Sequence, residues 1–84
     1  MRPHTKPTPK QIVQMDKELK RLLNTVGADW IQALLGVQDS TIRGWVFRGR
    51  ISAKAANELC KCENVQGLGF TRESLRPDVE YWYV

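Results

Sequence analysis

Three glycines divide the first three fifths of the chain into short segments, and this division constrains the fold more than any other feature. Gly27, Gly36 and Gly49 each follow a stretch whose apolar residues recur three or four positions apart, as on one face of an α-helix. Glycine readily adopts the left-handed conformation in which many helices end. A chain divided at these intervals forms short helices, so the sequence predicts an all-α fold.

Capping signals mark the expected helix starts. Thr8 and Gln11 match a capping box around Pro9, which suits the first helical position. Ser52 and Thr71 are N-cap residue types ahead of two later segments. The predicted helices cover residues 9 to about 24, 28–35, 38 or 39 to 48, 53 to about 61, and 72–75. The sequence therefore predicts a compact bundle of four to five short helices.

Apolar residues at helical spacing define the expected core. The residues expected to face inward are Ile12, Met15, Leu19, Leu22, Leu23, Val26, Ile31, Leu34, Leu35, Val37, Ile42, Trp45, Val46, Ala55, Ala56, Leu59 and Cys60. They lie on one side of each predicted helix, as amphipathic helices packed on a common core require.

The chain has room for one domain, because 84 residues lie near the lower end of usual domain sizes. We expect a flexible basic arm over residues 1–8, a helical domain over 9–78, and an aromatic tail over 79–84. The formal net charge is +4, and the basic residues concentrate in the first three quarters, which favours a polyanionic partner there. Without a membrane-length apolar run or a signal-peptide pattern, we expect a cytoplasmic protein with no membrane partner.

The two cysteines and the single histidine do not form a metal-binding pattern. On a helix, Cys60 and Cys62 would point about 200° apart, and with His4 they supply only three ligands. No nucleophile lies in an activating motif, and no glycine-rich phosphate loop is present. We therefore expect reduced thiols, no metal, no cofactor, no small-molecule substrate and no enzyme activity.

Residues 28–47 match the pattern of a helix-turn-helix unit. Such a unit consists of a helix of about eight residues, a short turn that contains glycine, and a second helix that enters the major groove of DNA. Gly36 tolerates the positive φ that the turn needs. The apolar positions through which the two helices would touch are Ile31, Leu35, Val37, Ile42 and Trp45. This segment therefore predicts DNA binding.

Over about residues 28–78, the chain resembles the Cro and repressor class of phage regulators and, within it, the small YdaS/Cro-like group. The similar segments read Leu34-Leu35-Gly36-Val37, Thr41-Ile42-Arg43-Gly44-Trp45-Val46, Arg48-Gly49-Arg50-Ile51 and Thr71-Arg72-Glu73-Ser74-Leu75-Arg76-Pro77-Asp78. The chain departs from the family at Gln32, where a small residue is usual, and at Ser52, where proline is common. The resemblance implies a lambda repressor-like DNA-binding fold.

The resemblance also implies that the start of the helix after Gly36 faces DNA bases. Arg43 is the first candidate, since arginine can pair in bidentate fashion with guanine O6 and N7. Asp39 could instead cap the helix, and the charged residues could also be a solvated surface. The candidates for base readout are Gln38, Asp39, Ser40, Thr41, Arg43 and Gly44. The candidates for the DNA backbone are Arg48, Arg50, Ser52, Lys54 and Lys10, together with Arg2 and Lys6 of the arm.

These roles imply a transcriptional repressor that binds operator DNA as a homodimer, because one helix-turn-helix reads only a few base pairs. The aromatic tail and the last helices are the expected dimer surfaces. An antitoxin that pairs with a toxin and represses its own operon is one alternative. Another is a protein-interaction module with the same fold, whose binding would be insensitive to salt. Activator and excision roles also stay open.

Overall fold

Residues 7–79 of the chain are described by the structure, a computed structural model, and they form six α-helices. The helices are α1 (Pro9–Val26), α2 (Ala28–Leu35), α3 (Asp39–Arg48), α4 (Ala53–Leu59), α5 (Glu63–Gly67) and α6 (Arg72–Leu75). Within this described range there is no strand. The predicted all-α class is therefore confirmed, but the expected number of four to five helices is too low.

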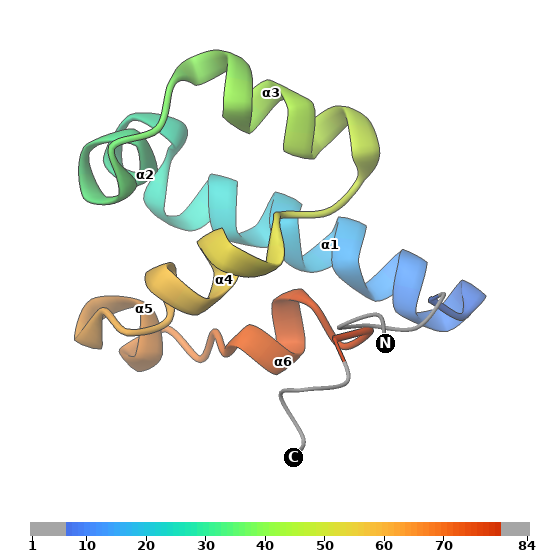
Figure 1. The fold of residues 1–84 in the computed structure, drawn as a ribbon. Helices are drawn as coiled ribbons and strands as arrows, with labels where there is room; N and C mark the ends of the chain where they lie inside the picture. Colours follow the sequence, from blue (N-terminus) through green and yellow to red (C-terminus); the bar gives the residue numbers. More distant parts are fainter. Residues whose placement is uncertain (1–6, 80–84) are drawn as a thin grey trace.

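The longest helix, α1, crosses the fold, and the shorter helices pack around it. In Figure 1, α3 lies on one side of α1 and α6 lies on the other. α1 contacts α2, α3 and α6, while α4 contacts α2 and α6. The bundle measures 33 × 26 × 21 Å along its principal axes. No helix in the described part of the chain is both long enough and apolar enough to span a membrane.

A complete capping box starts α1, as the sequence predicts. The Thr8 hydroxyl accepts a hydrogen bond from the Gln11 backbone N–H at 3.2 Å, and the Gln11 side chain accepts one from the Thr8 N–H at 2.9 Å. The amide of Gln11 also donates to the Pro77 carbonyl at 3.3 Å. The same side chain therefore starts the helix and ties it to the end of the domain. α1 continues to Val26, two residues beyond the expected end.

The helix that the sequence did not predict is α5. Its N-cap residue, Cys62, makes no side-chain capping hydrogen bond. Val65 and Phe70 are fully buried, and the Phe70 N–H donates to the Val65 carbonyl at 3.3 Å. Packing of Val65 and Phe70 in the core therefore stabilises α5, which is too short to show an apolar stripe in the sequence.

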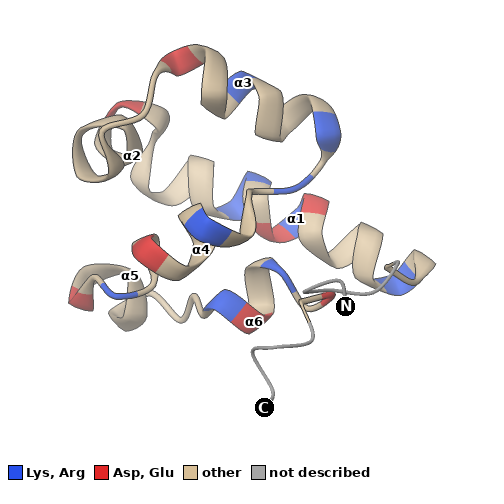
Figure 2. Cartoon of the chain, in the orientation of Figure 1, with Lys and Arg blue, Asp and Glu red and all other residues tan. Residues whose placement is uncertain are grey.

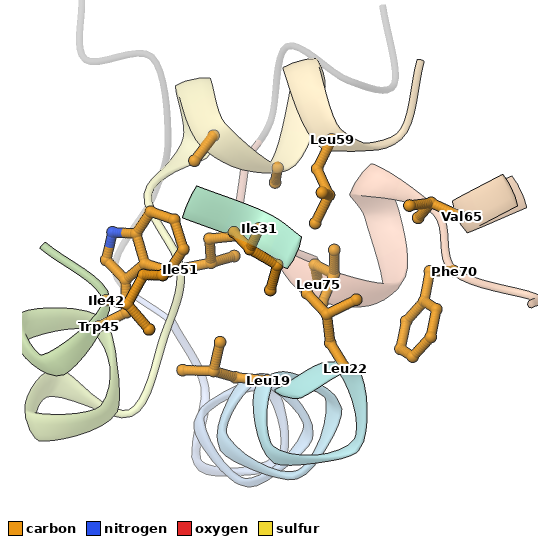
Figure 3. Packing of buried hydrophobic residues seen from close by; sticks show 12 residues of the cluster. Leu19, Leu22, Ile31, Ile42, Trp45, Ile51, Leu59, Val65, Phe70 and Leu75 are labelled. Atoms are coloured by element: carbon orange, nitrogen blue, oxygen red, sulfur yellow. The ribbon is translucent and has the colours of Figure 1, made fainter. Parts of the chain in front are cut away.

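One continuous core joins the helices. Leu19, Ile31, Trp45, Leu59 and Leu75, from five different helices, are almost completely buried and point toward a common interior (Figure 3). Most of the expected inward residues lie in this core or pack against it. The exceptions are Ile12, Leu34 and Val46, which are exposed. Ile12 lies in the first turn of α1, and Leu34 and Val46 lie about 60° and 40° around their helices from the buried Ile31 and Ile42, so the short helices α2 and α3 bury only a narrow stripe.

A buried ion pair follows α6. Arg76 Nε and Nη2 lie 2.8 and 2.9 Å from the two carboxylate oxygens of Asp78, and Arg76 Nη1 donates to the Ile51 carbonyl at 3.0 Å. The side chains of Arg76 and Asp78 are only 7% and 1% exposed. Val79 is also buried. This pair attaches the end of the domain to the connection between α3 and α4. Nearly all of the expected arm and tail, residues 1–6 and 80–84, lies outside the described residues.

Candidate nucleic-acid interface

Gly36, between α2 and α3, adopts the left-handed conformation that the sequence predicts for it. Gly36 ends α2 in the left-handed region, with φ 69° and ψ 26°, and its N–H donates to the Gln32 carbonyl at 2.8 Å. Gln38 then adopts an extended conformation as the N-cap of α3. Because non-glycine residues adopt such a positive φ only at a cost, Gly36 allows the chain to turn between two helices within three residues.

Five apolar side chains hold these two helices, as expected. Ile31, Ile42 and Trp45 are buried, and Leu35 and Val37 are partly buried against the same core. The buried side of α3 is therefore fixed by Ile42 and Trp45, so its opposite side faces solvent.

Arg43 lies on this solvent side, and its side chain is 81% exposed. Its Nε lies 2.7 Å from Asp39 Oδ2, one turn earlier on α3. Exposed ion pairs of this kind contribute little stability, so a stronger acceptor can replace Asp39. The Asp39 side chain makes no capping hydrogen bond, since the N-cap is Gln38. The capping role considered for Asp39 is therefore wrong, and pairing with Arg43 takes its place.

Gly44 makes room for a second guanidinium group on α3. A Cβ atom at Gly44 would lie 3.2 Å from Arg48 Nη1, so the Arg48 side chain extends back over the glycine. The other candidates near the start of α3, Gln38, Ser40 and Thr41, are exposed. Five of the six base-readout candidates are therefore exposed, Gly44 is half-buried, and the guanidinium group of Arg48, the last residue of α3, lies beside Gly44.

Three of the candidates meet in one hollow between α3 and α4. Thr41, Ser52 and Lys54 line a space of about 220 Å³ together with apolar side chains that include Trp45. Ser52 caps α4, because its hydroxyl accepts a hydrogen bond from the Ala55 N–H at 3.2 Å. Lys54 is exposed on the first turn of α4. One candidate for base readout, Thr41, and two candidates for the DNA backbone, Ser52 and Lys54, therefore line the same hollow beside α3.

Basic residues dominate the chain from α3 into α4. Residues 39–54 contain Arg43, Arg48, Arg50 and Lys54 but only one acid, Asp39. Figure 2 shows this positive charge on α3, on the connection that follows it, and at the start of α4. The excess of positive charge on this surface would attract a polyanion.

Lys10 lies on a different helix from these basic residues. It is exposed in the first turn of α1 and does not line the hollow between α3 and α4. Arg2, His4 and Lys6, the other expected contributors from the arm, lie outside the described residues.

Sequence reasoning missed Phe47, whose exposed fraction is 92%. Its position four residues after Arg43 was the available signal, because residues four apart share one face of a helix. A phenylalanine near the end of an apolar-spaced helix resembles a core residue, but the register of Ile42 and Trp45 turns it outward.

A larger hollow, of about 420 Å³, lies between α4, α5 and α6 and is a weaker candidate site. Its lining includes Cys60, Arg72 and Glu73, and Arg72 donates to Asn57 Oδ1 at 3.1 Å. Burial, and to a smaller extent the negative charge of Glu73, raise the pKa of Cys60 to about 11. The positive charge of Arg72 lowers this pKa, but by less than the other two effects raise it. The thiol is therefore protonated at neutral pH and is not an activated nucleophile. Among the described residues, no three His, Cys, Asp or Glu side chains are grouped to hold a metal ion.

The raised pKa of Cys60 predicts slow alkylation. In a Cys62→Ser variant, which leaves Cys60 as the only cysteine, we expect iodoacetamide to react much more slowly with native protein than with urea-unfolded protein at pH 8. The native rate should then rise as the pH approaches 11, where the thiolate forms. Mass spectrometry measures both rates. Equal rates at pH 8 for the native and unfolded chains would contradict this explanation.

Comparisons with known proteins do not add to these observations: no family model, no curated protein and no solved structure matches the chain.

Proposed function

We propose that the protein is a sequence-specific DNA-binding transcriptional regulator in which α2 and α3 form a helix-turn-helix. The observation that carries this proposal is the division of α3 into two sides. Ile42 and Trp45 anchor one side in the core, while Arg43 extends from the other side into solvent. A basic connection follows the same helix. A fixed helix with an exposed arginine and flanking positive charge is what insertion into the major groove requires.

In this proposal the residues divide into two kinds of contact. Arg43 leaves Asp39 and pairs with guanine O6 and N7, which identifies the base. Arg50, Lys54 and the Ser52 region contact phosphates, which position the protein without reading sequence. Asp39, Ser40 and Thr41 remain available near the N-terminal end of α3 for neighbouring base edges. Specificity and overall affinity therefore depend on different side chains.

The regulator acts as a homodimer on an inverted repeat in this proposal. Two recognition helices reach successive major grooves when they are about 34 Å apart, and a subunit whose longest dimension is 33 Å is compatible with that spacing. Bound at a promoter, such a dimer represses by excluding polymerase. An autoregulating antitoxin would make the same DNA contacts and would differ in its protein partner.

Replacing Arg43 tests the proposal. A duplex selected from a random library is compared with a scrambled duplex by fluorescence anisotropy at two salt concentrations. We expect Arg43→Ala to weaken binding to the selected duplex by roughly 5- to 150-fold, the value of one bidentate base contact. Binding to the scrambled duplex should change much less. Arg43→Lys should lose most of the discrimination although it keeps the charge, because an ammonium group lacks the planar fork of a guanidinium.

Lys17→Ala is the matched control, since Lys17 is an exposed basic residue of α1 outside the α3 surface. It should leave the ratio of the two affinities unchanged. Equal and weak binding of the wild-type chain to both duplexes would reject a sequence-specific regulator and favour a protein-interaction module.

A further inference from the structure

Phe47 presents its ring to solvent on the side of α3 that the proposed function directs toward DNA. Its exposed fraction of 92% exceeds that of the other exposed large hydrophobic residues in the described chain. Because Arg43 precedes it by four residues, the two side chains lie about one turn apart on the same side. Ile42 and Trp45 occupy the buried side. Core packing therefore does not account for a phenylalanine at this position.

Positive charge lies next to this ring. Arg43 is one turn away, and the Arg48 guanidinium lies over Gly44, three residues before Phe47. If a second copy of the chain packed on this surface about a twofold axis, these guanidinium groups would approach their own copies, and like charges would repel. The surface instead matches a partner that combines negative charge, hydrogen-bond acceptors and a small apolar group.

We propose that Phe47 is a specificity-determining residue that packs against the 5-methyl group of a thymine. This inference rests on the proposed function, because it requires α3 to lie in the major groove. There, guanine supplies acceptors for arginine, phosphates supply negative charge, and the thymine methyl is the apolar group on the base edge. Residues four apart are separated by about 6 Å along a helix, and base pairs by about 3.4 Å. The thymine therefore lies within two base pairs of the guanine that Arg43 contacts.

The test removes that methyl group alone. Duplexes are selected from a random library with the full chain, and each thymine of the selected site is then replaced by deoxyuridine. We expect one replacement, within two base pairs of a guanine whose contribution depends on Arg43, to weaken binding roughly fourfold, the effect of one buried methyl-sized group. The Phe47→Ala variant should bind both duplexes equally. Fluorescence anisotropy measures the affinities, and thermal unfolding shows that the variant is folded.

Leu68→Ala is the matched control, because Leu68 is an exposed apolar residue at the end of α5 rather than on α3. It should keep the full response to deoxyuridine. Specific binding that depends on Arg43 but ignores every deoxyuridine would overturn the role of Phe47 and leave the proposed function intact. Failure to select any sequence would overturn both. If Phe47→Ala keeps the deoxyuridine response but shifts the sedimentation of the free chain, the ring is a protein contact and the inference is wrong.

Discussion

Replacement of Arg76 by methionine is expected to destabilise the fold by about 3–5 kcal/mol, because it removes a positive charge that lies 2.8 Å from the buried Asp78 carboxylate. The Ile51 carbonyl also loses the hydrogen bond that Arg76 Nη1 donates at 3.0 Å. For a domain of this size, 1 kcal/mol corresponds to roughly 4–8 °C in Tm. The variant should therefore melt at least about 12 °C below the wild type. Thermal and urea unfolding followed by circular dichroism measure the change.

Variants at Asp78 test whether the loss of stability comes from a buried charge that has lost its ion-pair partner. Asp78→Asn should be destabilising for the converse reason, since it removes the negative charge that the buried Arg76 guanidinium contacts through Nε and Nη2. Replacing both partners, as Arg76→Met with Asp78→Leu, should cost less than either single change because no unpaired charge is buried. Lys61→Met breaks an exposed pair with Glu58 and should stay within about 0.5 kcal/mol of the wild type. Single variants at Arg76 that also stay within that limit would show that the buried pair does not stabilise the fold.

This pair also links fold stability to the proposed interface. Ile51, which accepts the hydrogen bond from Arg76, lies between Arg50 and Ser52 in the connection after α3. Loosening the pair would free that connection as well as the end of the domain. DNA affinity of a folded Arg76 variant is therefore expected to fall even though Arg76 itself is 6% exposed.

Local signals in the sequence predict the parts of this fold that depend on local chemistry. The Thr8 and Gln11 side chains cap the helix in which they lie, so the start of α1 follows from four adjacent residues. Gly36 ends α2 through a backbone conformation that its own residue type favours. The division of α3 into a buried and an exposed side follows in the same way from the spacing of Ile42 and Trp45. These features include most of the candidate interface.

Features that depend on distant residues could not be predicted. α5 forms because Val65 and Phe70 are buried by other helices, and its own five residues carry no such signal. The Arg76 side chain finds a carbonyl 25 positions earlier in the chain, which no local pattern specifies. The position of Phe47 could have been predicted in part, since the helical register set by Ile42 and Trp45 places it on the solvent side of α3. The sequence analysis assigned Phe47 neither to the core nor to the interface.

Neutralising Arg50 and Lys54 together is expected to weaken binding to DNA of every sequence. These residues flank Ser52 in the connection from α3 and in the first turn of α4. If each contacts one phosphate, the Arg50→Gln and Lys54→Gln double variant should make the negative slope of log K against log salt shallower by about 1.8. At about 0.1 M salt the same loss of counterion release corresponds to roughly 60-fold weaker binding. Anisotropy titrations across a salt series measure both quantities.

The size of this loss should not depend on DNA sequence, because phosphates are the same in every duplex. Selected and scrambled duplexes should therefore lose affinity equally, whereas Arg43→Ala should reduce their ratio. Lys17→Gln with Lys61→Gln is the matched control: it removes the same number of charges from the +4 chain but from α1 and from the turn after α4. If the control changes the salt slope as much as the double variant does, binding reflects net charge alone. If the salt slope changes in the Arg50 and Lys54 double variant but not in the control, the phosphate contacts lie beside α3.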